Sequence, residues 1–431
     1  MGRSPFRVAI VGAGPAGSAL AILLARQGAQ VTLFDHGRRP PLLVGESLVP
    51  AIVPILQRLG FEQETAAVGL VKPGVTFVWS PQDRASFRFA RFAPAVPPYA
   101  YNIPRPQFDE ALLARAVASG AHRVVIHARL DRANGPTREL ALSPDTLAAA
   151  PSLEGRQPDL IVDATGRARQ AARALDIPAR VGPRDDIAHF AHYQRFSWDD
   201  EPGQVVISRI KAGWSWRIPL KDRLSVGIVV DRREAENLGR TAEERLERAI
   251  AIDAWLPETL AEATRVSPTA TYSNYQLISE RGSGPGWVMI GDAFGFVDPM
   301  LSPGVFLGLR SAELVADALA PFARGRREPT PEALASALDS YAATQTAMLD
   351  AWMELVAFLY DGRLMAMLRA GHGWIGARPS RLRTAAQNHI ERQVALQASG
   401  VATTSRYGRG LLRLLGRYGL RGVEPAELAL H

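Results

Sequence analysis

The sequence predicts an α/β fold in three parts: a discontinuous domain built on a parallel sheet, a domain built on an antiparallel sheet, and a C-terminal helical region. Three observations indicate this. A strand, a glycine turn, a helix and a second strand follow one another within residues 7–35, aromatic and valine-rich strands fill residues 185–275, and helical patterns cover residues 331–431. Because an apolar strand at 287–290 leads into another glycine-opened helix, we expect the chain to return there to the first domain.

Length and composition limit the class of protein and the kinds of site that the chain can contain. At 431 residues, with 47% apolar and 22% charged residues, the chain is expected to be globular and to contain more than one domain. It has no cysteine, which excludes disulfides, thiolate metal sites and cysteine nucleophiles, and we expect no metal. The predicted limits are 1–184 for the first segment, with short second-domain strands near 75–100, then 185–280 for the second domain, 281–330 for the return segment and 331–431 for the helical region.

The net charge is +7, and the lysines among the 50 basic residues are few: Lys72, Lys211 and Lys221. This charge suits acidic partners or cofactors, but without a nucleic-acid motif it predicts no binding to DNA or RNA. The first strand begins by residue 8 and no apolar run reaches about 18 residues. We therefore expect neither a signal peptide nor a transmembrane helix, and a cytoplasmic location.

The glycine turn has the full context of a dinucleotide-binding fingerprint. Between the strands at 8–11 and 31–34 the chain reads Gly12-Ala13-Gly14-Pro15-Ala16-Gly17. Gly12 allows the tight turn, Gly14 lets a pyrophosphate approach the backbone, and Gly17 lets helix and strand pack closely. The helix N-terminus attracts the phosphate charge, and Asp35 is expected to hold the ribose hydroxyls. Residues 371–376 also spell GxGxxG, but no strand leads into them, so we expect an interhelical loop.

Two short segments follow the first unit. The run Gly45-Glu46-Ser47-Leu48 precedes a helical pattern at 52–59. Ser47 is there either a helix N-cap or part of a turn that brings backbone donors to a cofactor. Residues 69–79 predict a turn followed by an alternating strand, and Lys72 lies within them.

The first domain then continues. Arg105 opens a second amphipathic helix that extends to residue 118, with Pro106 at a plausible first position. We expect a strand at 124–128, then a Pro/Ser-rich excursion to about residue 157. The apolar run at 159–163 predicts a buried parallel strand that ends at a glycine turn.

The second domain is predicted from strands at 190–196, 204–210, 214–218 and 224–230, with a helix at 242–252. The return segment contains Gly291 and Asp292 directly after its strand, and Pro299 and Gly304 before a helix that extends to residue 319.

At these positions the chain resembles the FAD-dependent oxidoreductases of the aromatic-hydroxylase fold, and among them most of all the flavin-dependent halogenases. The general likeness runs from residue 6 to about 320 and includes the glycine turn, Asp35, Arg105, Asp163-Ala164-Thr165-Gly166 and Gly291-Asp292. The likeness to halogenases rests on Gly45-Glu46-Ser47-Leu48, on Lys72-Pro73-Gly74, and on Trp214-Ser215-Trp216-Arg217-Ile218-Pro219, which fits a WxWxIP signature.

The resemblance implies FAD as the cofactor and assigns roles by position. The residues expected to bind FAD are Gly12, Gly14, Pro15, Ala16, Gly17, Asp35, Gly45, Glu46, Ser47, Arg105, Gly291, Asp292 and Gly304. Those expected to line the passage for substrate or halide are Trp214, Trp216, Pro219, Ser302 and Pro303. The alternative for the two tryptophans is an ordinary place in the core, since residues two apart in a strand share a face.

Lys72 is the predicted catalytic residue. In a chain whose basic positions are nearly all arginine, a lysine indicates chemistry that a guanidinium cannot perform. A desolvated amine of lowered pKa can donate a hydrogen bond to hypohalous acid or form a haloamine. The alternative is a solvated surface lysine beside a Pro-Gly turn.

Two positions depart from the halogenase pattern. Leu301 stands where some halogenases place a glutamate before the serine. The resemblance therefore disfavours the tryptophan branch and favours the branches that act on phenols or carrier-bound pyrroles. Pro303 stands in the segment whose backbone N–H groups are thought to cradle halide, and proline has no N–H to offer.

The resemblance implies a two-component halogenase. A partner flavin reductase uses NAD(P)H to supply reduced FAD, O2 gives a flavin C4a-hydroperoxide, and halide attacks it to give hypohalous acid. The acid passes to Lys72 and then to an electron-rich aromatic of phenol or pyrrole type, free or tethered to an acyl or peptidyl carrier protein. The alternatives are an FAD-dependent monooxygenase or reductase that has lost halide binding, and a flavoprotein-like subunit that scaffolds a biosynthetic complex.

Arginines recur every three or four residues near the C-terminus, at Arg406, Arg409, Arg413, Arg417 and Arg421. This pattern predicts either a basic amphipathic helix that docks an acidic carrier protein or a membrane surface, or a solvated face. Five glycines between residues 408 and 422 weaken the helix.

Overall fold

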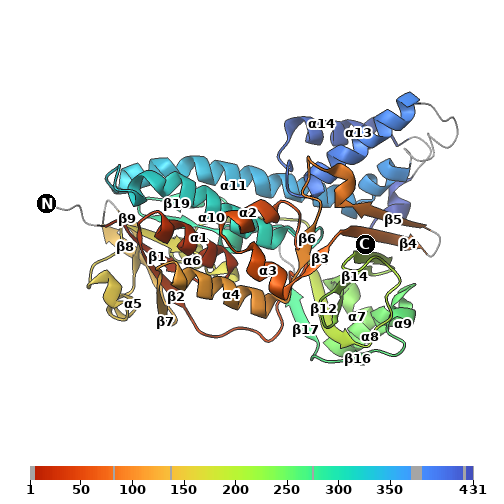
Figure 1. Cartoon of the computed structure of the whole chain (residues 1–431), viewed down its shortest axis with the longest axis horizontal. Coiled ribbons are helices and arrows are strands. Elements are labelled where there is room, and N and C mark those ends of the chain that lie inside the picture. The colour runs from red at the N-terminus through yellow and green to blue at the C-terminus, as the bar shows by residue number, and fades with distance from the viewer. Residues whose placement is uncertain are drawn as a thin grey trace.

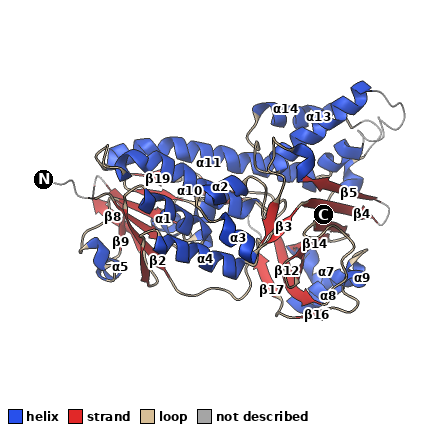
Figure 2. Ribbon diagram, in the orientation of Figure 1, coloured by secondary structure: helices blue, strands red, loops and turns tan. Residues whose placement is uncertain are grey.

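The computed structural model describes residues 5–80, 83–135, 138–273, 276–369, 381–420 and 424–430. The second GxGxxG sequence, at 371–376, and Arg421 lie outside the described residues. Figure 1 shows two sheets side by side, with the long helix α11 (Pro331–Tyr360) extending along the first sheet toward the second. Figure 2 shows the helices that cover each sheet.

The first sheet has six strands and is almost entirely parallel. Its order is β19 (Ser283–Gly284), β20 (Trp287–Met289), β10 (Leu160–Asp163), β1 (Arg7–Val11), β2 (Gln30–Asp35) and β7 (His122–Val125). Only β19 pairs in the antiparallel sense. The buried strands β1 and β10 carry the apolar runs expected of a sheet covered on both faces. Strands from residues 7–163 and from residues 283–289 meet here, which confirms the predicted discontinuous α/β fold.

Three helices hold this sheet to the rest of the molecule. They are α1 (Pro15–Arg26), α4 (Arg105–Ala118) and α10 (Pro303–Ala323), with α1 packed against the other two. Every residue of α1 from 17 to 24 is buried. Because this helix is apolar all round, it serves as the central element between the sheet and α10.

The second sheet has eight strands. Its order is β16 (Thr264–Arg265), β12 (Asp186–Gln194), β15 (Leu224–Asp231), β14 (Gly213–Pro219), β13 (Val205–Ile210), β4 (Gly74–Ser80) and β5 (Asp83–Arg88), with β17 (Ala270–Ser273) paired to β12. The antiparallel sheet was predicted, but β4 and β13 pair in parallel. The reason is topological: β4 comes from a distant part of the chain, so no hairpin dictates its direction.

A small apolar cluster of its own lies beneath this sheet. The helices α7 (Arg232–Leu238), α8 (Ala242–Ile252) and α9 (Leu256–Thr259) cover it. Thr241 caps α8 in a complete capping box with Glu244, which explains why the helix begins where the sequence predicted. The opposite face of the sheet is left to form the wall of a cavity.

The Pro/Ser-rich region contains regular elements. The Pro/Ser-rich excursion before residue 157 contains a hairpin, β8 (Leu130–Gly135) and β9 (Arg138–Leu142), followed by α5 (Pro144–Ala148). No strand or helix was predicted in this excursion. Leu140 and Leu142 alternate into the core, and Ser143 caps α5, so period-two burial and capping outweigh the turn-rich composition.

The remaining elements are short. They are α2 (Ile52–Arg58), α3 (Glu62–Val68), α6 (Gln170–Ala174), the pair β3 (Leu70–Lys72) and β6 (Ala100–Asn102), and the three-stranded sheet of β11 (Ala179–Val181), β18 (Leu277–Ser279) and β21 (Gly295–Phe296).

The C-terminal helices are α11, α13 (Arg381–Ala398) and α14 (Arg406–Tyr418). Two of the arginines that recur in α14, Arg409 and Arg413, both pair with Glu354 of α11. These two arginines therefore hold α14 against α11. None of the helices in the described part of the chain combines the length and apolarity that crossing a bilayer requires.

The last described segment, residues 424–430, lies against the second sheet. The indole N–H of Trp79 donates to the carbonyl of Leu428 at 3.1 Å, and Arg209 donates to the carbonyl of Glu427 at 2.6 Å. The N–H of Leu430 donates to the carbonyl of Tyr360 at 2.8 Å. This segment thus joins β4, β13 and α11.

Gly227 of β15 lies directly opposite Trp216, and a Cβ at this glycine would lie 2.2 Å from the indole ring. We expect Gly227→Ala to lower the free energy of unfolding by about 1–3 kcal/mol, because overpacking forces the ring from its place. Chemical denaturation followed by tryptophan fluorescence measures this. The control Gly410→Ala, where a Cβ meets nothing within 4 Å, should instead stabilise α14 slightly. Unchanged stability of Gly227→Ala would contradict the packing of Trp216.

Candidate cofactor-binding and active site

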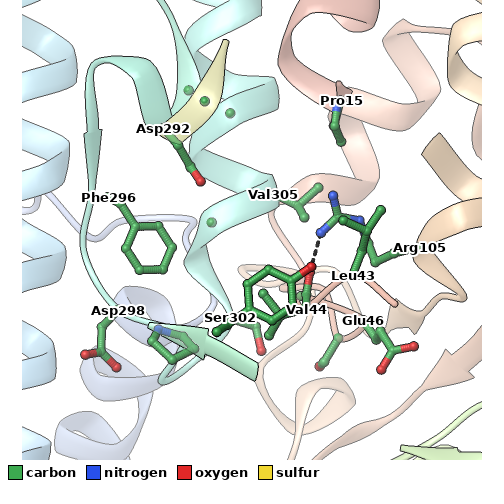
Figure 3. Close-up of a pocket in the computed structure, with 18 of the residues that line it drawn as sticks. Pro15, Leu43, Val44, Glu46, Arg105, Asp292, Phe296, Asp298, Ser302 and Val305 are labelled. Atoms are coloured by element: carbon green, nitrogen blue, oxygen red, sulfur yellow. Dashed lines mark hydrogen bonds between the residues drawn. The ribbon is translucent and has the colours of Figure 1, made fainter. Parts of the chain in front are cut away.

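A cavity of about 330 Å³ opens between the two sheets (Figure 3). The predicted site residues that line it are Gly14, Pro15, Ala16, Gly45, Glu46, Ser47, Arg105, Trp214, Trp216, Gly291, Asp292, Ser302 and Gly304. The predicted residues that do not line it are Gly12, Gly17, Asp35, Lys72, Pro219 and Pro303. The structure thus brings most of the predicted residues together around one cavity.

Two helices point their N-termini at this cavity. The N-cap of α1 is Gly14 and that of α10 is Ser302, and neither N-terminus has a side-chain cap. The first N–H groups of a helix carry partial positive charge and lack intrahelical partners. The cavity therefore offers two sets of backbone donors suited to an anionic or carbonyl-bearing ligand.

The glycine turn shows why each glycine is needed. Gly12 has a φ of +112°, and a Cβ there would lie 2.3 Å from the carbonyl oxygen of Ala164. A Cβ at Gly17 would lie 2.0 Å from the carbonyl oxygen of Gly12. A Cβ at Gly14, in contrast, meets no protein atom within 4 Å. Gly12 and Gly17 serve the packing of the turn, whereas Gly14 leaves open space beside the helix N-terminus.

Asp35 ends β2 and is buried. Its carboxylate accepts hydrogen bonds from the N–H of Gly37 at 3.1 Å and from Arg123 at 2.6 Å. Burial by itself raises the pKa of Asp35, but these bonds and nearby Arg39 lower the pKa below its usual value. The carboxylate is thus ionised and held by Arg123, and its predicted contact with a ribose stays a prediction.

Residues 45–48, here called the strap, connect the first sheet to the second. Ser47 bridges to Asn102 of β6, and the N–H of Leu48 donates to the carbonyl of Tyr101 at 2.9 Å. Glu46 lines the cavity, and its carboxylate lies 2.9 Å from Nε2 of His192 on β12. The reading of Ser47 as a helix N-cap is wrong, since the N-cap of α2 is Ala51.

Charges of both signs face one another across the cavity (Figure 3). Arg105 is held by two hydrogen bonds to Asp109 at 3.0 Å and donates to the carbonyl of Val44 at 2.5 Å. Burial raises the pKa of Asp292 to about 6, although Arg167 and Arg105 act in the opposite direction. A carboxylate that has lost so much water is well suited to accept hydrogen bonds from the hydroxyls of a ligand.

Lys72 ends β3 and is only 3% exposed, so the reading as a solvated surface lysine is wrong. Its Nζ donates to Oγ of Ser47 at 2.8 Å and to the carbonyl of Leu48 at 3.0 Å. Burial lowers the pKa of Lys72 to about 7. The amine therefore lies behind the strap rather than on the cavity wall.

Trp214 and Trp216 share one face of β14, with ring centroids 5.8 Å apart. Both are buried and both line the cavity, so they are wall residues rather than core residues alone. The indole N–H of Trp214 donates to the hydroxyl of Tyr360 at 3.0 Å, which fixes the ring. Pro219 lies beyond the cavity, where its carbonyl accepts from Asn102 at 3.0 Å.

The turn before α10 is built from residues in the left-handed region. Leu301 and Ser302 have φ values of 64° and 59°, a conformation that non-glycine residues seldom adopt. The N–H of Ser302 donates to the carbonyl of Pro299 at 3.0 Å. Pro303 occupies the first position of the helix, where a missing N–H costs no helical hydrogen bond. The next N–H groups, at Gly304 and Val305, belong to residues that line the cavity.

Several cavity residues were not found from the sequence. The guanidinium of Arg167 lies 5.3 Å from the ring of Tyr272 and 5.8 Å from that of Phe296. Asp298 also lines the cavity, and its carboxylate accepts at 3.2 Å from the hydroxyl of Tyr360, which lies just outside the cavity. Arg167 could have been predicted from the sequence, since it follows the glycine turn after β10. Tyr272 and Tyr360 gave no local signal, because only the tertiary fold brings them here.

The arrangement defines a class of protein. The chain belongs to the FAD binding domain family, whose pattern it matches over residues 6–355. It is 27% identical over 366 residues to a tryptophan 2-halogenase of Chondromyces crocatus, covering 83% of this chain and 68% of the relative. It is also 27% identical to the 1H-pyrrole-2-carbonyl-[peptidyl-carrier protein] chlorinase of Pseudomonas fluorescens over 342 residues, 72% of this chain and 75% of the relative.

The solved structures agree on the fold. A myxobacterial chondrochloren halogenase, described as a variant of FAD-dependent halogenases, superposes with a TM-score of 0.72 and 24% identity over the whole of both chains. The chain is therefore an FAD-binding protein of this family, and the relatives and solved structures that it resembles include flavin-dependent halogenases. Its relatives include tryptophan and carrier-bound pyrrole halogenases at equal identity.

The residues of the cavity fit FAD. The open space at Gly14 lies at the N-terminus of α1, where a pyrophosphate gains from the helix dipole. Asp292 presents its carboxylate to the middle of the cavity, where the ribityl hydroxyls of FAD would lie, and Arg105 faces it. The predicted roles of these single residues stay predictions.

We expect Gly14→Val to abolish FAD binding without unfolding the protein, because its side chain enters only the space that the ligand needs. The flavin absorbance of the purified protein and its far-UV circular dichroism measure the two effects. Gly410→Val, in open space on α14, serves as the matched control and should keep its flavin. A folded Gly14→Val protein with full flavin content would contradict the site.

Asp292→Asn should stabilise the FAD-free protein above pH 6 and weaken FAD binding. The folded pKa of about 6 exceeds the ordinary 3.8, so folding takes up a proton in between, and the ionised carboxylate destabilises the fold at higher pH. Thermal unfolding of FAD-free wild-type and variant proteins should differ at pH 7.5 and converge at pH 4. A stability gain that does not depend on pH would exclude this account.

Proposed function

We propose that the protein is a two-component flavin-dependent halogenase that acts on an electron-rich aromatic of phenol or pyrrole type. The observation that carries this proposal is a buried lysine amine of lowered pKa, Lys72, hydrogen-bonded to a residue of a cavity whose opposite wall is formed by Trp214 and Trp216. A simple flavin-binding scaffold has no need of a desolvated amine at this place, because burying it costs free energy.

Bound reduced FAD would supply the activation of O2 that converts a halide into hypohalous acid. The residues of this chain do the rest. The tryptophans exclude water and hold an aromatic ring flat against the second sheet. The first N–H groups of α10 after Pro303, at Gly304 and Val305, are the donors we assign to the halide.

The proline at position 303 thus moves the halide site rather than removing it. Only one N–H is missing, and two consecutive N–H groups follow it on the same helix turn. The helix dipole adds to their effect, since α10 extends over 21 residues. This supports halogenation over the monooxygenase alternative.

An external flavin reductase is the second part of the proposal. In the sequence, the only strand-turn-helix unit of the dinucleotide type leads into α1. The electrons of NAD(P)H would therefore arrive on reduced FAD from a partner. A carrier-tethered substrate is the third part, and it is supported by the likeness to the pyrrole chlorinase, whose printed name includes a peptidyl carrier protein.

The test is to incubate the protein with FAD, a generic flavin reductase, NADH, bromide and a panel of phenols and pyrroles. Mass spectrometry should find bromine added to at least one phenol or pyrrole. Lys72→Arg keeps the charge but cannot become a neutral amine, so bromination should fall by at least about a hundredfold while flavin oxidation continues. The exposed control Lys211→Arg should retain bromination.

Two other results would contradict the proposed function. A wild-type product that gains oxygen instead of bromine, with Lys72→Arg equal to wild type, would identify a monooxygenase. Flavin binding without any turnover would favour a scaffolding subunit.

A further inference from the structure

The amine of Lys72 lies close to the cavity but does not line it. The strap stands between them. Of the two acceptors of the amine, the carbonyl of Leu48 belongs to the backbone, whereas Oγ of Ser47 belongs to a residue that does line the cavity. Any effect of the amine on a molecule in the cavity has its shortest path through the Ser47 hydroxyl.

We propose that Ser47 is the residue that contacts hypohalous acid, and that Lys72 acts through it as the proton-donating partner. This inference rests on the proposed halogenase function and assigns its last step. Ser47 is held firmly for such a role: it bridges to Asn102 of β6, while β3, which carries Lys72, pairs with the same strand. The same strand, β6, therefore holds both Ser47 and Lys72 in place.

The direction of the hydrogen bond decides what Ser47 can do. A protonated amine has only donors, so Oγ of Ser47 must accept from Nζ, and the hydroxyl hydrogen is left to point elsewhere. On the cavity side it can donate to the oxygen of hypohalous acid. A neutral amine instead takes the hydroxyl hydrogen of Ser47 for itself, and the serine then offers the cavity no donor.

The aromatic carbon attacks the halogen, the O–X bond breaks, and its electron pair stays on oxygen. That oxygen takes the proton of the Ser47 hydroxyl and leaves as water, while Ser47 takes a proton from the Lys72 ammonium. The ring then loses the proton of the substituted carbon, and a proton returns to Lys72. The sum is the aromatic plus hypohalous acid giving the haloaromatic plus water.

A haloamine on Lys72 fits the geometry less well. It would require Nζ to meet hypohalous acid directly, and the strap blocks that approach. It would also place a halogen in a pocket already filled by the ring of Phe89, 5.6 Å from Nζ, and by the strap carbonyl. A relay needs no such space, because only hydrogens move.

The ionisable groups on the elements packed around Lys72 have partners of their own. Glu46 on the strap is bound to His192, and Tyr101 on β6 donates to Glu62. Arg88, on β5 opposite Gly74, pairs with Glu201. Burial is what lowers the pKa of Lys72 to about 7. Because the relay needs the ammonium form, halogen transfer should be complete below this pH and lost above it.

The experiment uses the holoenzyme with pre-reduced FAD, O2, bromide and an accepted phenol or pyrrole, at pH 6 and pH 8. For a pKa of about 7, the wild-type transfer rate should fall about tenfold between these pH values. Ser47→Ala should be slow at both, at least about tenfold below wild type at pH 6. Ser47→Thr keeps the hydroxyl and should keep the wild-type profile.

Two further variants separate a relay from a loss of structure. Lys72→Met should match Ser47→Ala, and the double variant should be no slower than either, because the two residues form one path. Lys72→Met leaves Ser47 in place, so it carries the test if Ser47→Ala loses FAD. Lys211→Met, on the surface, serves as the control and should follow wild type.

A diffusible diketone that traps free hypohalous acid distinguishes the two ways to fail. Wild-type protein that yields neither trapped halogen nor haloaromatic would overturn the proposed function itself. Wild-type protein that yields both, while Ser47→Ala keeps the wild-type rate and pH profile, would overturn only the relay. Additive losses in the double variant would overturn it too.

Discussion

The close backbone approach around the first glycine turn is the constraint on which the rest of the structure depends. The turn after β1 comes so near to the end of β10 that Gly12 admits no Cβ against Ala164, and α1 comes so near to that turn that Gly17 admits none either. This contact fixes the angle of α1, and α1 in turn positions α10. Because both helices aim their N-termini at one cavity, two glycines set the place where a charged ligand can bind.

The second sheet forms the apolar wall of the cavity. Its cavity face is apolar and aromatic, and its rings are tied by their polar edges to residues outside the cavity, such as Tyr360 and Ser225. A ring whose N–H is already satisfied offers only its face to a substrate. The cavity therefore divides into a charged part beside the first sheet and a dry part beside the second, with the strap as the boundary.

The glycine fingerprint, the four long strands of the second sheet and the return segment could be predicted because each depends on residues adjacent in the chain. The parallel pairing of β4 with β13 could not, since it depends on which distant strand is free at the edge. Lys72 was singled out by its rarity, but its place behind Ser47 follows from the pairing of β3 with β6, which leaves no local pattern. Tyr360 was missed for the same reason, because α11 meets β14 only in the folded chain.

The contacts of residues 424–430 have a practical side. Trp79, Arg209 and Tyr360 all bind backbone carbonyls or an N–H of this segment, and Tyr360 also holds Trp214 in the cavity wall. An affinity tag or a fused domain joined after residue 430 would therefore start beside the cavity wall that contains Trp214. Figure 1 places the other end of the chain at the far side of the first sheet. Purification handles and immobilisation linkers for this protein belong at the N-terminus.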